Sequence, residues 1–202
     1  MLFQGVLTKM QTELSAPINY YLTLGNDLVQ VHQLVCKKLK LKFMGYQCLS
    51  CGSDAVIFRQ GYCKSCFFEL PQTADWILHP EKSKAHLGIE ERDLEYEKKV
   101  QLKPHIVYLA NSSNVKVGVT RKTQVPTRWI DQGAQAALEI LEVPNRYLAG
   151  IAEVALKNYV SDKTNWREML KGRAAETDLT VLRQTLISHL PQAVQPYVLN
   201  NK

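Results

Sequence analysis

Four cysteines in two closely spaced pairs are the residues of this sequence best suited to chemistry. Cys48 and Cys51 form one pair, Cys63 and Cys66 form the other, and residues 52–62 separate them. A Cys-x2-Cys turn places two thiolates on one side of a tight loop, and two such turns complete the tetrahedral coordination of Zn²⁺. Because cysteine fills all four positions and leaves none for water, the spacing predicts a structural zinc ribbon over residues 48–66.

Zinc is the better of two explanations for these thiols, the other being two redox-active Cys-x2-Cys motifs. Zinc binding, at about 10–16 kcal/mol, would also stabilise a segment too short to build its own core. The fifth cysteine, Cys36, is expected to be a buried small hydrophobe. Since five is an odd number, a closed disulfide framework is not expected.

The zinc pairs belong to a segment, residues 1–70, that is predicted to be a β-rich module. Alternating apolar residues predict strands over 18–24 and 29–31, joined by a turn at Gly25-Asn26-Asp27. Residues 71–103 follow as a partly helical connector, in which prolines mark breaks in regular structure.

Basic side chains at regular spacing are candidates for contact with nucleic acid. Lys38, Lys40 and Lys42 alternate with apolar residues and would form one face of a third strand. They would either keep an edge strand from pairing with another chain or contact the phosphates of a polyanion. Arg121 and Lys122 follow a later predicted strand. Two interpretations of them are equally favoured, as phosphate contacts or as ordinary loop charges.

Residues 104–172 predict a small α/β domain with the element order β-β-α-β-α-α, and residues 173–202 predict a C-terminal helix and tail. The fold class is therefore α+β. The expected elements are strands over 105–110, 115–120 and 137–143, and helices over 126–133, 147–160, 164–170 and 174–190.

This order of elements, with its short motifs, resembles the GIY-YIG nuclease superfamily over residues 104–172. Ile106-Val107-Tyr108 is similar to the first family motif, and Lys116-Val117-Gly118 is similar to the second. Arg128 stands where the family has a helical arginine, Glu153 where it has a metal-binding glutamate, and Asn165 where it has a later asparagine.

The whole chain also resembles an uncharacterised bacterial family of unknown function. The stretches that carry this resemblance include His79-Pro80-Glu81 and residues 126–133. This second resemblance implies no established activity.

The GIY-YIG resemblance implies divalent-metal-dependent hydrolysis of phosphodiester bonds, with Mg²⁺ or Mn²⁺ held by Glu153. Tyr108 would position or deprotonate water, and Arg128 would neutralise developing charge on the phosphoryl group. These side chains would meet over one face of the sheet. Lys116 departs from the family, because it occupies a tyrosine position. There it would act as a phosphate cation or a water-orienting group, or it would mark a degenerate site.

Each of these side chains also has a structural alternative. Tyr108 would simply pack in the core as a strand aromatic. Glu153 would form an exposed i,i+4 ion pair with Lys157, worth ~0.3–0.5 kcal/mol. Arg128 would be solvated or would stack on Trp129.

The composition is that of an ordinary globular protein with a modest basic excess. Hydrophobic residues make up 46% of the chain, and 25 Lys+Arg against 19 Asp+Glu give a net charge of +6. The excess lies in residues 1–70 and 104–202, whereas residues 71–103 are nearly neutral. With no apolar run long enough to span a membrane and no secretory signal, the chain is expected to be cytoplasmic.

Together these observations predict a nucleic-acid-binding protein with a structural zinc ribbon and a GIY-YIG-like endonuclease site. Two alternatives stay open. One is a catalytically inactive nucleic-acid-binding module. The other is a protein-interaction scaffold in which zinc only stabilises the fold.

Overall fold

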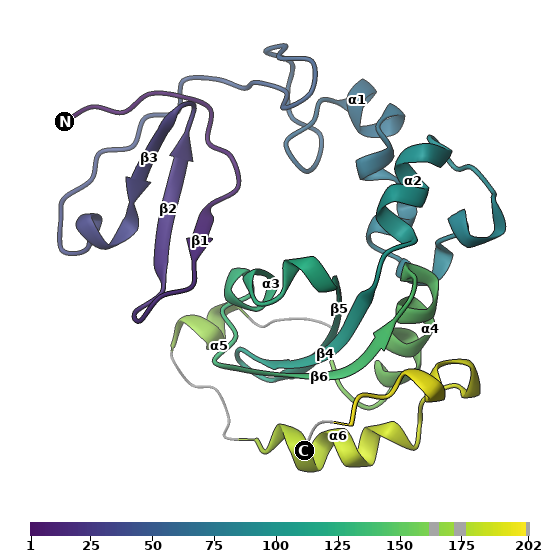
Figure 1. Cartoon of the computed structure of the whole chain (residues 1–202). Helices are drawn as coiled ribbons and strands as arrows, with labels where there is room; N and C mark the ends of the chain where they lie inside the picture. The colour runs from purple at the N-terminus through teal and green to yellow at the C-terminus, as the bar shows by residue number, and fades with distance from the viewer. Residues whose placement is uncertain (162–165, 172–176, 201–202) are drawn as a thin grey trace. The chain divides into compact units, whose positions relative to one another are not determined.

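The computed structural model of the chain describes residues 1–161, 166–171 and 177–200. Within these ranges the protein is mixed α+β, with two separate three-stranded antiparallel sheets (Figure 1). The chain divides into two compact units, Met1–Thr73 and Ala74–Lys202. Among the described residues, no helix has the length and apolar character needed to cross a membrane.

The first unit begins with a sheet of strands β1 (Gln11–Glu13), β2 (Asn19–Leu24) and β3 (Asp27–Gln30), in that order. The two strands predicted around the turn at Gly25 are therefore confirmed. Gly25 has a φ of 58°, which is the left-handed conformation that this turn needs and that glycine adopts without strain.

The predicted third strand, with Lys38, Lys40 and Lys42 on one face, is wrong. Residues 37–47 form no helix or strand, and the apolar residues between the lysines are exposed like the lysines themselves. A strand needs neighbouring backbone to pair with its N–H and C=O groups, and side-chain alternation alone does not supply that neighbour. Cys36, which was expected to be buried, is exposed as well.

The second unit begins with three short 3₁₀ helices, Asp75–Ile77, Pro80–Lys82 and Ala85–Leu87. They lead into α2 (Leu94–Gln101), which begins where the Asp93 carboxylate accepts a hydrogen bond from the Tyr96 N–H. The predicted connector is thus partly helical, and all of it beyond Thr73 lies in the second unit.

The sheet of the second unit consists of β4 (His105–Asn111), β5 (Val115–Arg121) and β6 (Ala136–Val143), and β4 is the central strand. Tyr108 pairs with Gly118 of β5 and with Glu139 of β6. A register shift between Val107 and Tyr108 leaves one extra residue in β6 at this point.

Helices flank this sheet in the order that the sequence predicts, β-β-α-β-α-α. They are α3 (Thr127–Asp131), α4 (Arg146–Leu156), α5 (Trp166–Leu170) and, after these, α6 (Leu179–Ile187). Figure 1 shows α3 and α6 on opposite sides of the sheet. Asn165, the expected match to a family asparagine, lies outside the described residues.

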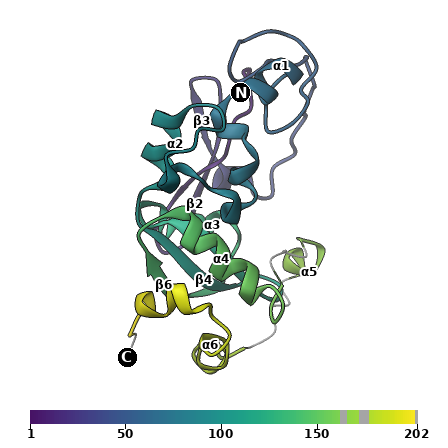
Figure 2. The ribbon, with the colours of Figure 1, turned by 90° about the vertical axis from the view of Figure 1, so that its right-hand side faces the viewer.

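Near its C-terminus the chain returns to the sheet through a 3₁₀ helix, Gln192–Tyr197 (Figure 2). Beyond it, Val198 bridges Leu141 of β6, and the Leu199 N–H donates to the Ile140 carbonyl.

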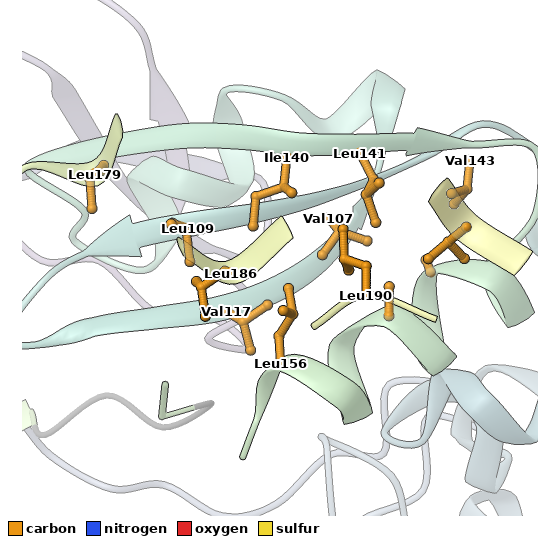
Figure 3. Packing of buried hydrophobic residues seen from close by; sticks show 13 residues of the cluster. Val107, Leu109, Val117, Ile140, Leu141, Val143, Leu156, Leu179, Leu186 and Leu190 are labelled. Carbon is orange, nitrogen blue, oxygen red and sulfur yellow. The ribbon is translucent and has the colours of Figure 1, made fainter. Parts of the chain in front are cut away.

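Two apolar clusters, one on each face of the sheet, form the core of the second unit. The larger cluster takes side chains from β4, β5, β6, α4 and α6, as Figure 3 shows for Val107, Val117, Leu141 and Leu156. The smaller cluster, on the α3 side, contains Tyr108 together with Ile106 and Ala110. Since β4 contributes alternate residues to both clusters, it is buried along its whole length.

Candidate functional site

The four cysteine thiols of the first unit converge on one point. Their sulfur atoms all lie within 4.8 Å of one another, and Cys48 and Cys63 are buried. This is the arrangement of a metal centre with four sulfur ligands, which is the donor set that structural zinc prefers. The prediction that these cysteines are positioned to hold a metal ion is confirmed.

Two tight turns bring the cysteine pairs together. After the first pair, Gly52 has a φ of 72° and its N–H donates to the Cys48 carbonyl at 3.0 Å. Before the second pair, Gly61 has a φ of 87°, and a side chain there would strike Leu49. The pairs are joined directly by the backbone N–H of Cys63, which donates to Cys48 Sγ at 3.3 Å.

Hydrogen bonds make the four thiols unequal before any metal is considered. The N–H of Cys63 is the main cause that lowers the pKa of Cys48 to about 6. The Ser53 hydroxyl, 3.2 Å from Cys51 Sγ, lowers the pKa of Cys51. Hydrogen bonding with the Cys63 thiol raises the pKa of Cys66 to about 12. Two of the ligands thus favour the thiolate form that zinc binds.

In the second unit, Tyr108 occupies the centre of the sheet, where its ring is fully buried. The ring lies over Gly118, where an added Cβ would approach the Tyr108 Oη to 2.8 Å. Its hydroxyl donates to Gln132 Oε1 at 3.0 Å, and the ring of Trp129 lies 6.0 Å away, centroid to centroid. Burial is the main cause that raises the pKa of Tyr108.

Arg128 and Glu153 both act electrostatically on Tyr108, although they approach it differently. Arg128, which is exposed on α3, lowers the pKa of Tyr108 through its charge and through a hydrogen bond. Glu153 lies on α4, which packs mainly against the cluster on the other face, yet its charge raises the pKa of Tyr108. Glu153 is buried, and its Oε2 lies 3.6 Å from Lys157 Nζ. Tyr108 thus interacts electrostatically with both Arg128 and Glu153.

Arg146 is a member of this site that sequence reasoning missed. Its Nε and Nη2 donate to the carbonyls of Trp76 (3.1 Å) and Ile77 (2.8 Å). Burial lowers its pKa to about 10, Glu153 opposes this shift, and the positive charges of Arg121 and Arg128 add to it. The sequence did contain one signal of its role. A positive charge in the first turn of a helix is unfavourable because it opposes the helix dipole, so an arginine there indicates a compensating interaction.

Tyr108, Arg121, Arg128, Arg146 and Glu153 are called the Tyr108 cluster below. It joins four residues singled out from the sequence, together with Arg146, into one electrostatic network.

The remaining candidate residues lie on β5, after β5 and in the first unit. Lys116 of β5 is only 6% exposed, and its backbone bridges Ser161. Lys122 forms an ion pair with Glu142, with Nζ 2.8 Å from both carboxylate oxygens. Lys38, Lys40 and Lys42 are exposed in the first unit.

Acid is expected to destabilise the second unit through His105. Burial lowers the pKa of this imidazole to about 4, and its Nδ1 lies 2.7 Å from the Lys103 carbonyl. The unfolded chain binds a proton near pH 6.5, so between pH 6.5 and 4 it holds more protons than the folded chain. The free energy of unfolding should therefore decrease as the pH is lowered from 6.5 to 4, by up to about 3 kcal/mol.

Hydrogen exchange of β4 and β6 amides measures this effect without interference from acid release of zinc in the first unit. A His105→Gln variant should show a flatter pH dependence than the parent protein, and a His79→Gln variant, changed at an exposed imidazole, should not. Equal slopes for His105→Gln and the parent protein would contradict the assignment.

One family model matches most of the chain. Its description is "Protein of unknown function (DUF2797)", and it matches residues 36–202, which include the four cysteines and the Tyr108 cluster. No curated protein and no solved structure matches the sequence significantly.

Proposed function

The chain belongs to the DUF2797 family of unknown function, and from its site we propose that it binds nucleic acid and hydrolyses phosphodiester bonds at the Tyr108 cluster. The observation that carries this proposal is the electrostatic interaction of three guanidinium groups. Arg121, Arg128 and Arg146 are close enough for two of them to lower the pKa of the third.

Like charges held together cost free energy unless an anion compensates them. Within the network, Glu153 and Glu81 raise the pKa of Arg146 and so offset part of the repulsion. A phosphate group would offset the remainder, and Arg121 and Arg128 would bind its oxygens, since Arg146 already donates to two backbone carbonyls and contributes its charge. The cluster is thus suited to a phosphodiester, and it would also stabilise the negative charge that develops during hydrolysis.

Tyr108 acts in this proposal as a fixed hydrogen-bonding group and not as a base. Its raised pKa keeps the hydroxyl neutral, and Gln132 together with the close Gly118 backbone holds it in place. Glu153 is the carboxylate that would accept a proton from water as the water oxygen bonds to phosphorus. The bond from phosphorus to one ester oxygen breaks, and that oxygen takes a proton from solvent.

The Mg²⁺ or Mn²⁺ expected at Glu153 finds no comparable support. Among the described residues, the cysteines are the only group of three or more His, Cys, Asp or Glu side chains placed to share an ion. The Glu153 carboxylate already faces Lys157. A catalytic ion is therefore not part of the proposed mechanism, and its effect is left to the assay.

A second function, binding without cleavage, is favoured by Lys116. The tyrosine position of the second motif holds this buried cation, so one hydroxyl of the resembled site is missing. Such a protein would still bind phosphates through its arginines. It would differ from the nuclease only in leaving the substrate intact.

A cleavage assay on Glu153→Gln distinguishes these functions. The zinc-loaded full chain is incubated with labelled single-stranded, duplex and branched DNA and with RNA, with Mg²⁺, with Mn²⁺ or with neither. No chelator is added, because it would remove the zinc. Loss of the base should slow cleavage by about 10²–10⁴-fold while binding persists.

Glu142→Gln is the matched control, because Glu142 is a carboxylate of the same unit that, like Glu153, is ion-paired with a lysine. It should cleave like the parent protein. Intact substrates with all proteins would contradict hydrolysis, and salt-sensitive binding in that case would support the binding-only function. The absence of both would reject the proposal and leave the scaffold alternative.

A further inference from the structure

We propose that the first unit binds single-stranded nucleic acid on exposed aromatic rings beside the cysteine cluster. The rings are those of Phe43, Tyr46, Phe58 and Phe68, which we call the aromatic platform. This inference rests on the proposed function in one respect, since it names the class of nucleic acid, but it concerns a separate part of the chain.

The platform consists of two groups of rings that face solvent. Phe43 and Tyr46 are 72% and 46% exposed, and their ring centroids lie 5.1 Å apart. Phe58 and Phe68 are 42% and 56% exposed, with centroids 5.6 Å apart and planes inclined by 37°. Each group thus exposes two large aromatic side chains, a feature that usually marks a site of interaction.

The second group of rings is rigidly supported. Phe67 is buried beneath it and contacts both exposed rings edge-on, with centroid distances of 5.2 Å to Phe58 and 5.4 Å to Phe68. Phe67 and Phe68 lie on α1 (Lys64–Glu69), the helix that begins directly after Cys63. The metal centre therefore fixes the position of these rings, which lowers the entropic cost of stacking a base on them.

Positive charge accompanies the rings. Residues 37–68 contain six basic residues and one acidic residue, Asp54. The guanidinium carbon of Arg59 lies 5.3 Å from the centroid of the Phe58 ring, a cation–π arrangement. Lys38, Lys40 and Lys42 extend from the exposed segment that leads to Phe43. Aromatic faces next to cations are the combination that binds single strands, through base stacking and phosphate contacts.

Other anionic partners fit this surface less well. In duplex nucleic acid the base faces are stacked on one another, so the rings would contact only edges and phosphates. In a lipid bilayer the backbone of residues 37–47, which forms no helix or strand, would lose its hydrogen bonds to water. A single strand can stack its bases on the rings and bring its phosphates to the basic side chains.

Fluorescence anisotropy with the zinc-loaded full chain tests the proposal. The probes are labelled single strands of about 12 nucleotides and the duplex of the same sequence. The single strand should bind more tightly than the duplex, and its affinity should fall as salt rises. Equal or tighter binding of the duplex would overturn the proposal.

Ring removal assigns the binding to the platform. Phe43→Leu and Phe68→Leu should each weaken single-strand binding about 10-fold, with zinc content unchanged. Tyr159→Leu, at an exposed ring of the second unit that stacks on His189, is the matched control and should bind like the parent protein. Unchanged affinity in both platform variants would overturn the proposal, as would binding of anionic vesicles in preference to the oligonucleotide.

The outcome is separable from that of the proposed function. Glu153→Gln is a test of cleavage in the second unit, whereas the platform variants test single-strand affinity in the first unit. If no substrate is cleaved but the platform variants bind weakly, the platform stands and hydrolysis fails. If cleavage occurs and the platform variants bind normally, hydrolysis stands and the platform fails.

Discussion

Replacing Cys63 with serine is expected to release the zinc ion and to unfold the segment from Cys48 to Glu69. The first unit has little else to hold this segment, since both apolar clusters of the described residues belong to the second unit. Four-sulfur zinc sites contribute about 10–16 kcal/mol, which exceeds the whole stability of many domains. Loss of one thiolate ligand removes most of that stabilisation.

Cys63 is the most informative of the four ligands. It supplies a buried sulfur, its N–H donates to Cys48 Sγ, and it is the residue from which α1 begins. The change therefore disrupts the metal site, the link between the two cysteine pairs and the start of the helix. It also removes the support of the aromatic platform.

Two measurements check this expectation. Metal analysis of the parent protein should find about one zinc per chain, and Cys63→Ser should contain almost none. Hydrogen exchange should lose protection at Leu49, Phe58 and Phe67, whose N–H groups donate to carbonyls within the segment. The β4 amides of the second unit should stay protected.

Cys36→Ser is the matched control, because Cys36 is exposed and stands apart from the cluster. It should keep both the zinc and the exchange pattern. Full protection of the segment in metal-free Cys63→Ser protein would show that zinc is not what folds it.

Replacing Gly150 with alanine is expected to destabilise the second unit by about 3 kcal/mol. At an exposed site within a helix the same change would stabilise by about 1 kcal/mol, because alanine is the better helix former. Here the sign is reversed by a tertiary contact. A Cβ at position 150 would meet the backbone between Pro80 and Glu81, including the Glu81 Cα at 2.6 Å.

Backbone atoms do not move aside in the way that the end of a flexible side chain does. The added methyl group must therefore push α4 away from the 3₁₀ helix Pro80–Lys82. Gly150 lies one helical turn from both Arg146 and Glu153, so the displacement would also disturb the Tyr108 cluster. We expect weaker phosphate binding together with the loss of stability.

Urea denaturation followed by exchange of β4 amides measures the change. Val154→Ala is the matched control, since Val154 is exposed on the same helix and should shift stability by less than about 1 kcal/mol. A Gly150→Ala protein as stable as the parent protein would mean that α4 does not pack this closely against Pro80–Lys82.

The cysteine site and most of the second-unit elements could be predicted from the sequence because the signals are local. The spacing within a Cys-x2-Cys turn is enough to place its two thiols on one side of the loop, and Gly52 supplies the left-handed conformation that closes the turn. In the strands at 105–111 and 115–121, apolar residues either alternate with polar ones or follow one another, and the turn between the strands is short. Such patterns depend on neighbours within a few residues, so one sequence displays them fully.

The segment at Lys38–Phe43 could not be predicted in the same way. Its alternation is as regular as that of a true strand, yet no neighbouring strand pairs with it in the described structure. Pairing is a property of two segments, and the second segment has to be available in space. The exposed rings of the first unit could not be predicted either, because the exposure of a side chain depends on what the rest of the chain covers.

The sequence by itself determined the donor set of the metal centre and the order of elements in the second unit, and its resemblance to the GIY-YIG superfamily made Tyr108, Arg128 and Glu153 candidates. Only the tertiary structure decided that Tyr108 is buried and held by Gln132, that Glu153 faces Lys157, and that Arg146 joins them from the start of α4. Residue types and short spacings limit which chemistry is possible. Distance, burial and the sum of nearby charges arise between residues far apart in the chain, and these set the pKa of each group and the ligand that it can hold.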